Sequence, residues 1–170
     1  MKKWTVVVLA LVFATGLVTA PAATADQAGS RLSGGYWVLR TPDGAGLVER
    51  DGLIGLGAPG RATRWRITYA GPSDSGPTYL IMASNNQRGW VLPGAAPSTP
   101  VRVSPMLLLP TDPRTLRWTI HSTNRGGRLE ITISSALNGW PVVPNGAYDP
   151  RLVVVPETFA PVTYLATRVG

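Results

Sequence analysis

The sequence predicts an all-β protein built from three copies of one four-stranded unit. Three observations lead to this prediction. Glycine and proline are abundant, with 19 and 16 among 170 residues. Short β-branched or aromatic segments recur between them, and one pattern of residues repeats along the chain. Glycines and prolines interrupt every helical period, so the chain favours short strands joined by turns.

The first segment is predicted to be an export signal. Met1–Lys3 is positively charged, an apolar run follows, and Ala23-Thr24-Ala25 has the small residues of a cleavage site before Asp26. We therefore expect a secretory signal peptide at 1–25, a short tail at 26–31 and a single domain at 32–170. The alternative is an uncleaved anchor, which the short apolar run disfavours.

The predicted strands are short and are bounded by Gly, Pro, Asn or Asp. Alternation within them places Trp65 and Ile67 on one face and Arg64 and Arg66 on the other, so the arginines are expected in water. The strands are predicted at 36–39, 53–56, 64–68, 78–81, 101–103, 116–120, 129–133 and 152–155.

The repeat has four recurring positions: an opening apolar residue, a glycine ten positions later, a large apolar residue directly after it, and a closing aromatic residue. In that order they are Tyr36, Tyr79 and Leu129; Gly46, Gly89 and Gly139; Leu47, Trp90 and Trp140; and Trp65, Trp118 and Tyr164. Three such units predict a β-trefoil, in which six strands close a barrel and six cap it as hairpins. The closing residues are then expected in equivalent core positions, and the glycines where a Cβ would be crowded. A sandwich of seven or eight strands explains the strands but not the repeat.

The composition offers few residues that could form a catalytic site. The absence of cysteine excludes a disulfide scaffold, a thiol nucleophile and Cys-based metal sites. The one histidine, His121, is expected at the surface near a strand end, and no Gly-x-Ser-x-Gly elbow accompanies it. Most carboxylates stand beside Gly or Pro in turn contexts. We therefore expect no enzyme activity, no catalytic residues, no metal and no cofactor.

The formal charge is +7, and both lysines lie in the signal, so the cations of the mature chain are all arginine. The arginines are scattered singly, and even the densest group, Arg61, Arg64 and Arg66, is not a long basic run. Nucleic-acid binders gather their cations on one face. We expect a secreted, extracellular monomer that binds neither nucleic acid nor, after signal cleavage, a membrane.

Motifs over residues 32–168 resemble the mycospin-type serine protease inhibitors, which are β-trefoil proteins first known from fungi. The likeness rests on the aromatic–x–apolar unit ends and on four segments: Gly35-Tyr36-Trp37-Val38, Gly139-Trp140-Pro141-Val142, Leu152-Val153-Val154-Val155 and Phe159…Tyr164-Leu165. The resemblance implies inhibition of an extracellular serine protease, trypsin- or subtilisin-like, through one exposed loop. The all-arginine composition favours a bacterial member. Fungal trefoils that inhibit cysteine proteases are a related alternative and use other loops.

The resemblance places the inhibitory loop between the second and third strands of the first unit. Here that loop is Glu49-Arg50-Asp51-Gly52. Arg50 is the expected primary residue, because a trypsin-like protease has an acidic pocket that takes a cation. Acidic neighbours flank it, and Arg88 and Arg114 are rival loop arginines.

A carbohydrate-binding trefoil of the ricin type is the alternative function. Those domains carry Gln-x-Trp near each unit's end, whereas Arg64 and Arg117 precede Trp65 and Trp118 here. A third hypothesis is an extracellular module that binds a partner and has neither activity.

Overall fold

The computed structural model describes residues 32, 34–106, 112–146 and 149–170. The predicted signal peptide at 1–25 and tail at 26–31 lie outside the described residues. No helix in the described part is long and apolar enough to cross a membrane.

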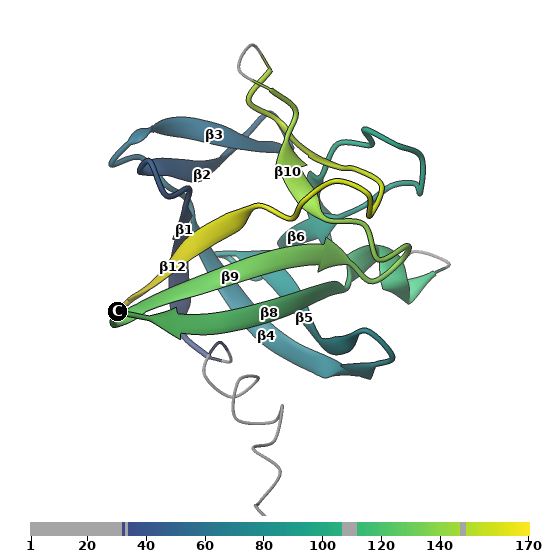
Figure 1. Cartoon of the computed structure of the whole chain (residues 1–170), viewed down its shortest axis with the longest axis horizontal. Helices are drawn as coiled ribbons and strands as arrows, with labels where there is room; N and C mark the ends of the chain where they lie inside the picture. The colour runs from purple at the N-terminus through teal and green to yellow at the C-terminus, as the bar shows by residue number, and fades with distance from the viewer. Residues whose placement is uncertain (1–31, 33, 107–111, 147–148) are drawn as a thin grey trace, which may run out of the picture.

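The described chain is built from strands, with one short 3₁₀ helix, η1 (Pro113–Leu116) (Figure 1). The predicted all-β class is therefore confirmed. The strands are β1 (Tyr36–Arg40), β2 (Ala45–Arg50), β3 (Leu53–Pro59), β4 (Arg64–Ser73), β5 (Gly76–Ala83), β6 (Arg88–Val91), β7 (Arg102–Pro105), β8 (Trp118–Arg125), β9 (Arg128–Ser135), β10 (Val142–Pro144), β11 (Leu152–Val154) and β12 (Thr163–Val169).

One predicted strand begins later than expected. The strand predicted at 116–120 starts at Trp118, because Pro113–Leu116 forms η1 instead. Asp112 caps this helix: its side chain accepts a hydrogen bond from the Arg114 amide, and Pro113 follows the cap, where its missing N–H costs nothing.

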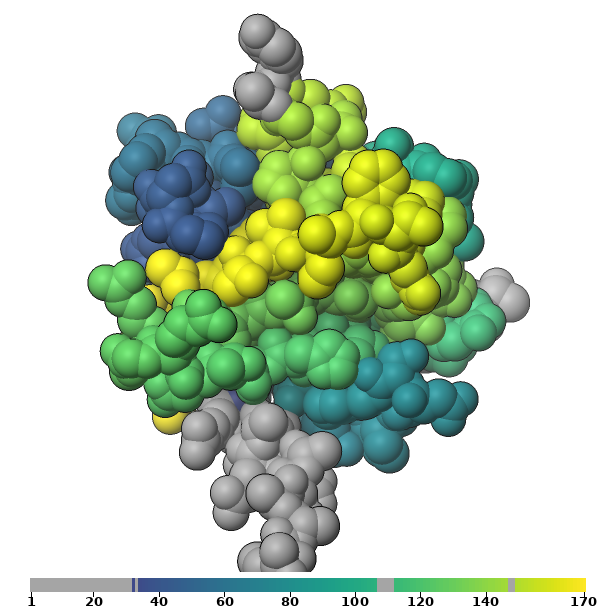
Figure 2. Space-filling model, viewed as in Figure 1, coloured from purple at the N-terminus to yellow at the C-terminus, as the bar shows by residue number. Residues whose placement is uncertain are grey.

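The sheet closes on itself. Antiparallel pairing runs from β1 to β4, β5, β8, β9 and β12, and β12 pairs back with β1. A sandwich of two open sheets does not close in this way. In Figure 2 the C-terminal segment, in yellow, lies between the blue residues of β2 and β3 and the green residues of β8 and β9. Closure leaves these six strands without an exposed edge.

The remaining strands form three hairpins: β2 with β3, β6 with β7, and β10 with β11. Figure 1 shows β2, β3 and β10 above β8 and β9. The hairpins also meet one another, since Leu53 of β3 pairs with Arg102 of β7. The predicted inhibitory loop is the turn of the first hairpin, so these contacts set its position.

The closing aromatic residues fill the core, as the repeat predicts. Trp65, Trp118 and Tyr164 are fully buried. Trp90 packs edge-to-face between the two tryptophans, with ring centroids 5.4 Å from Trp65 and 5.7 Å from Trp118. The Trp118 indole N–H donates to the Trp90 carbonyl at 3.3 Å, and the Tyr164 hydroxyl donates to the Val142 carbonyl at 3.0 Å. Aromatic packing and buried hydrogen bonds thus hold the centre without disulfides.

The register of the repeat differs from the predicted one in two units. The residues that face the closing aromatics across the ladder are Trp37, Tyr79 and Ile131, rather than Tyr36, Tyr79 and Leu129. In each unit, the residue three positions further along the same strand pairs with the glycine position of the repeat. That partner is Gly46 in the first unit, Gly89 in the second and Pro141 in the third. The buried residues directly after these partners are Leu47, Trp90 and Val142. Gly139 and Trp140 therefore belong to the turn before β10. Leu129 and Ile131 share one face of β9, so a period of two could not separate them.

Candidate functional site

The predicted inhibitory loop is a two-residue turn. β2 ends at Arg50 and β3 begins at Leu53, which pair across the ladder, so Asp51 and Gly52 alone connect the strands. Their φ angles are 52° and 73°. Asp-Gly with two positive φ angles is the sequence that a tight hairpin turn favours, because its twist matches that of the strands.

The second hairpin holds this turn in place. A Glu49 carboxylate oxygen lies 2.5 Å from an Arg88 guanidinium nitrogen. The Val103 amide donates to the Gly52 carbonyl at 2.9 Å, and Arg88 also donates to the Val103 carbonyl at 3.3 Å. On the other side, the Glu49 amide donates to the Thr63 hydroxyl at 3.0 Å. The turn is therefore anchored by contacts within its own unit and with the next one.

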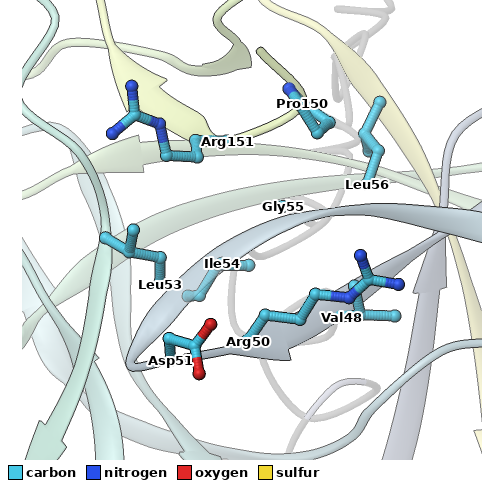
Figure 3. Close-up of a pocket in the computed structure, with 9 residues that line it drawn as sticks. All are labelled: Val48, Arg50, Asp51, Leu53, Ile54, Gly55, Leu56, Pro150 and Arg151. Carbon is cyan, nitrogen blue, oxygen red and sulfur yellow. The ribbon is translucent and has the colours of Figure 1, made fainter.

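Arg50 lies exposed at the end of the anchored hairpin. It makes no ion pair with any residue that the structure describes. In Figure 3 its guanidinium lies away from the Asp51 carboxylate. The acidic neighbours in the sequence thus leave the Arg50 cation available: Glu49 is bound to Arg88, and Asp51 points elsewhere.

An open groove of about 160 Å³ lies beside Arg50. Its walls include Leu53, Ile54 and Leu56 of β3, and Arg151 stands across it (Figure 3). A hydrogen bond from the Leu56 amide to the Pro150 carbonyl, 2.8 Å long, joins β3 to this far wall. The groove therefore has an apolar floor, with Arg50 and Asp51 on one rim and Arg151 on the other.

Arg151 is bound to a carboxylate, unlike Arg50. Its guanidinium lies 2.5 Å from Asp149, which also accepts from the Asn145 amide at 2.7 Å. Hydrogen bonds from Arg151 first, and then from Asn145, hold the pKa of the Asp149 carboxyl well below its usual range. This network joins Asn145, just after β10, to Asp149 and Arg151, just before β11.

The two rival arginines are also bound. Arg88 is part of the anchor of the turn, as described above, and is not a free loop cation. Arg114 forms a two-pronged ion pair with Asp112: Nε lies 3.1 Å from Oδ1 and Nη2 lies 2.7 Å from Oδ2. Hydrogen bonds from the Arg114 side chain lower the pKa of Asp112. Of the three candidates, Arg50 alone lacks a carboxylate partner among the described residues.

His121 is exposed, as expected, and lines a polar groove with Thr132 and Glu130. Glu130 is 3.7 Å from Arg125. Within the described ranges, no group of three or more His, Cys, Asp or Glu residues is placed to hold a metal ion.

Two features of the structure could not be predicted from the sequence. The Glu49–Arg88 pair joins residues that are remote in sequence, and no local pattern marks it. Phe159 is 58% exposed between β11 and β12, and its amide donates to the Pro156 carbonyl at 3.0 Å in a turn. The prolines at 156 and 161 mark that loop in the sequence, but periodicity does not show where its aromatic ring points.

Together, the closed barrel and its hairpins define an all-β protein with a β-trefoil-like fold. Among solved structures, a designed threefold-symmetric protein, ThreeFoil, matches with a TM-score of 0.56 at 12% identity, over 80% of this chain and 100% of that chain. The cytolethal distending toxin of Haemophilus ducreyi matches with a TM-score of 0.51 at 15% identity, over 79% of this chain and 84% of that chain.

The corresponding toxin of Actinobacillus actinomycetemcomitans matches with a TM-score of 0.51 at 14% identity, over 79% of this chain and 92% of that chain. No protein-family model matches the chain, and no curated protein sequence matches it. At these identities the structural likenesses show the fold alone.

Proposed function

We propose that the protein is a secreted inhibitor of serine proteases, built on a β-trefoil, with Arg50 as the side chain that enters the protease. The ring of six strands and the three hairpins support the trefoil assignment. The likeness to a designed threefold-symmetric protein supports it as well. The resemblance of its sequence motifs to those of mycospin-type inhibitors supports the inhibitory role.

The state of Arg50 is the observation that carries the proposal. The side chain is exposed, has no acidic partner among the described residues, and stands on a hairpin that is anchored on two sides. An anchored turn loses little freedom when it docks, so more of the interaction energy appears as affinity. A guanidinium buried against the acidic pocket of a trypsin-like protease gains charge-assisted hydrogen bonds.

The turn geometry determines how Arg50 would act. A protease takes its substrate as an extended strand, which requires a backbone free to pair with the enzyme. Arg50 is instead paired with Leu53, and the two residues that follow it have positive φ angles. The Arg50–Asp51 bond is therefore poorly placed for cleavage. The side chain fills the pocket while the peptide bond stays intact.

An inhibition panel tests the proposal. The purified mature protein is assayed against trypsin, subtilisin, chymotrypsin and papain, and a glycan array is run beside it. We expect inhibition of trypsin, no inhibition of papain, and no cleavage product at Arg50 by mass spectrometry after long incubation. Inhibition of papain alone would favour the cysteine-protease alternative, and glycan binding without inhibition would favour the lectin alternative.

A further inference from the structure

The loop between β11 and β12 carries the most exposed large apolar side chain of the described residues. Phe159 is 58% exposed, whereas Tyr69 is 43% exposed and packs edge-to-face on Tyr79, with ring centroids 5.8 Å apart. Phe159 makes no such ring contact in the part of the chain that the structure describes. All five residues from Glu157 to Pro161 are exposed, so the loop presents this ring to solvent. In Figure 1 the loop is the yellow coil that leads into β12.

Both ends of this loop are held against the rest of the fold. Before the loop, the Val155 amide donates to the Pro141 carbonyl at 3.1 Å, and after it, Val162 packs against the core. Within the loop, the Phe159 amide donates to the Pro156 carbonyl at 3.0 Å and closes a turn. A loop restrained in this way loses little conformational freedom when it binds a partner.

Two prolines and a glycine restrict the loop further. Pro156 and Pro161 fix their own φ angles, and Ala160 favours extended backbone because it precedes a proline. A Cβ at Gly139 would overlap a carboxylate oxygen of Glu157, so the Glu157 side chain lies directly against the backbone of the turn before β10. The segment that follows Phe159 therefore favours an extended form before any partner binds.

The main chain of this segment is available for pairing. The turn uses the Phe159 amide, but the Phe159 carbonyl and both main-chain polar groups of Ala160 form no hydrogen bond within the described ranges. The loop differs in this respect from Arg50, which pairs with Leu53 across the ladder. A protease binds an extended ligand through main-chain hydrogen bonds and accepts one side chain in its primary pocket.

We propose that Phe159 is the primary residue of a second inhibitory site, directed at serine proteases whose primary pocket is an apolar slot, as in chymotrypsin. A phenyl ring that enters such a slot gains a large apolar burial and requires no opposite charge in the pocket. The inference rests on the proposed inhibitory function but not on Arg50, because the loop and the chemistry of the pocket both differ.

Inhibition constants of the mature protein against chymotrypsin and trypsin test this site. We expect inhibition of both, and Phe159→Ala should weaken chymotrypsin inhibition by at least about tenfold while trypsin inhibition stays within about twofold. Tyr69→Ala is the matched control, because it removes an exposed aromatic ring outside the loop, and it should leave both constants within about threefold. Full chymotrypsin inhibition by Phe159→Ala, or an equal loss in Tyr69→Ala, would overturn the site.

An exchange of specificity separates a role in the pocket from a structural role. Phe159→Arg, made together with Arg50→Ala, should lose chymotrypsin inhibition and restore trypsin inhibition, because the loop then presents a cation. A folded double variant that inhibits neither protease would contradict the assignment, as would rapid cleavage of the wild type after Phe159 in mass spectrometry. Wild-type inhibition of trypsin alone would overturn the second site and leave the Arg50 proposal standing, and inhibition of chymotrypsin alone would do the reverse.

Discussion

Glu49 and Arg88 form a 2.5 Å ion pair that joins the turn of the first hairpin to the start of the second. Arg88 also donates to the carbonyl of Val103, whose amide donates in turn to Gly52. The direction in which Arg50 points therefore depends on two repeated units.

Breaking the Glu49–Arg88 pair should weaken protease inhibition clearly while lowering the free energy of unfolding only slightly. The side chain of Arg88 is 37% exposed and that of Glu49 is 17% exposed, so the pair should contribute no more than about 1 kcal/mol to folding. Arg88→Ala should lower stability by that amount and weaken trypsin inhibition severalfold, because Glu49 loses its ion pair and the Val103 carbonyl loses its side-chain donor. Urea unfolding and inhibition constants measure the two effects. Unchanged inhibition in Arg88→Ala would show that the pair does not position the loop.

Trp65 should be the most sensitive position in the core. It is fully buried and packs edge-to-face on Trp90, so Trp65→Ala should cost on the order of 3–5 kcal/mol by opening a cavity. Phe159→Ala is the control, because that ring is 58% exposed and its loss should change stability by about 0.5 kcal/mol or less. Denaturant unfolding measures both, and similar losses would contradict the core assignment.

Gly46 should not tolerate a side chain. Its Cβ would overlap the Arg61 carbonyl and the Ala62 side chain, so Gly46→Ala should destabilise the protein by roughly 1–3 kcal/mol through forced backbone shifts. A Cβ at Gly94 meets nothing within 4 Å. Gly94→Ala should therefore leave stability unchanged or raise it by up to about 1 kcal/mol. In thermal unfolding, Gly46→Ala should therefore lower the Tm clearly, whereas Gly94→Ala should leave the Tm unchanged or raise it slightly.

Tyr164 should make the fold sensitive to alkali. Burial raises the pKa of its hydroxyl, whereas tyrosines in the unfolded chain ionise near pH 10. The folded state holds this proton more tightly, so the contribution to stability is full below about pH 10 and is lost as the pH rises through the raised pKa. The free energy of unfolding of the wild type, measured with denaturant, should therefore fall over that pH range.

Tyr164→Phe isolates this effect. The variant should lose about 1 kcal/mol at neutral pH, since the hydrogen bond to the Val142 carbonyl is gone. Above pH 10 its stability should fall less steeply than that of the wild type. Parallel slopes would mean that another group governs the alkaline transition.

The fold could be predicted from the sequence to a large extent because alternation and turn residues are local signals. They indicated the strands and the buried Trp65, Trp118 and Tyr164. The register of the third unit could not be predicted, because Leu129 and Ile131 are both apolar and lie on the same face of one strand. The ladder partner Tyr164 distinguishes them, and that pairing exists only in the folded chain.

The candidate site was predictable only in part. The Asp51-Gly52 dipeptide marks a turn by its own chemistry, so the position of the loop could be predicted from its residues and the resemblance. Which arginine is bound to a carboxylate depends on tertiary contacts. Arg114 meets Asp112 close in sequence, but Arg88 reaches Glu49 from another unit, and neither charge pattern nor spacing indicates that contact.

The inhibition constant of Arg50→Ala against trypsin tests the central claim most directly. Arg114→Ala is the matched control, since it removes an exposed arginine that is already paired with Asp112. We predict that Arg50→Ala loses inhibition by at least about a hundredfold, because a filled acidic pocket is worth several kcal/mol, whereas Arg114→Ala stays within about threefold of the wild type. Full inhibition by Arg50→Ala, or failure of the wild type to inhibit any serine protease tested, would contradict the account.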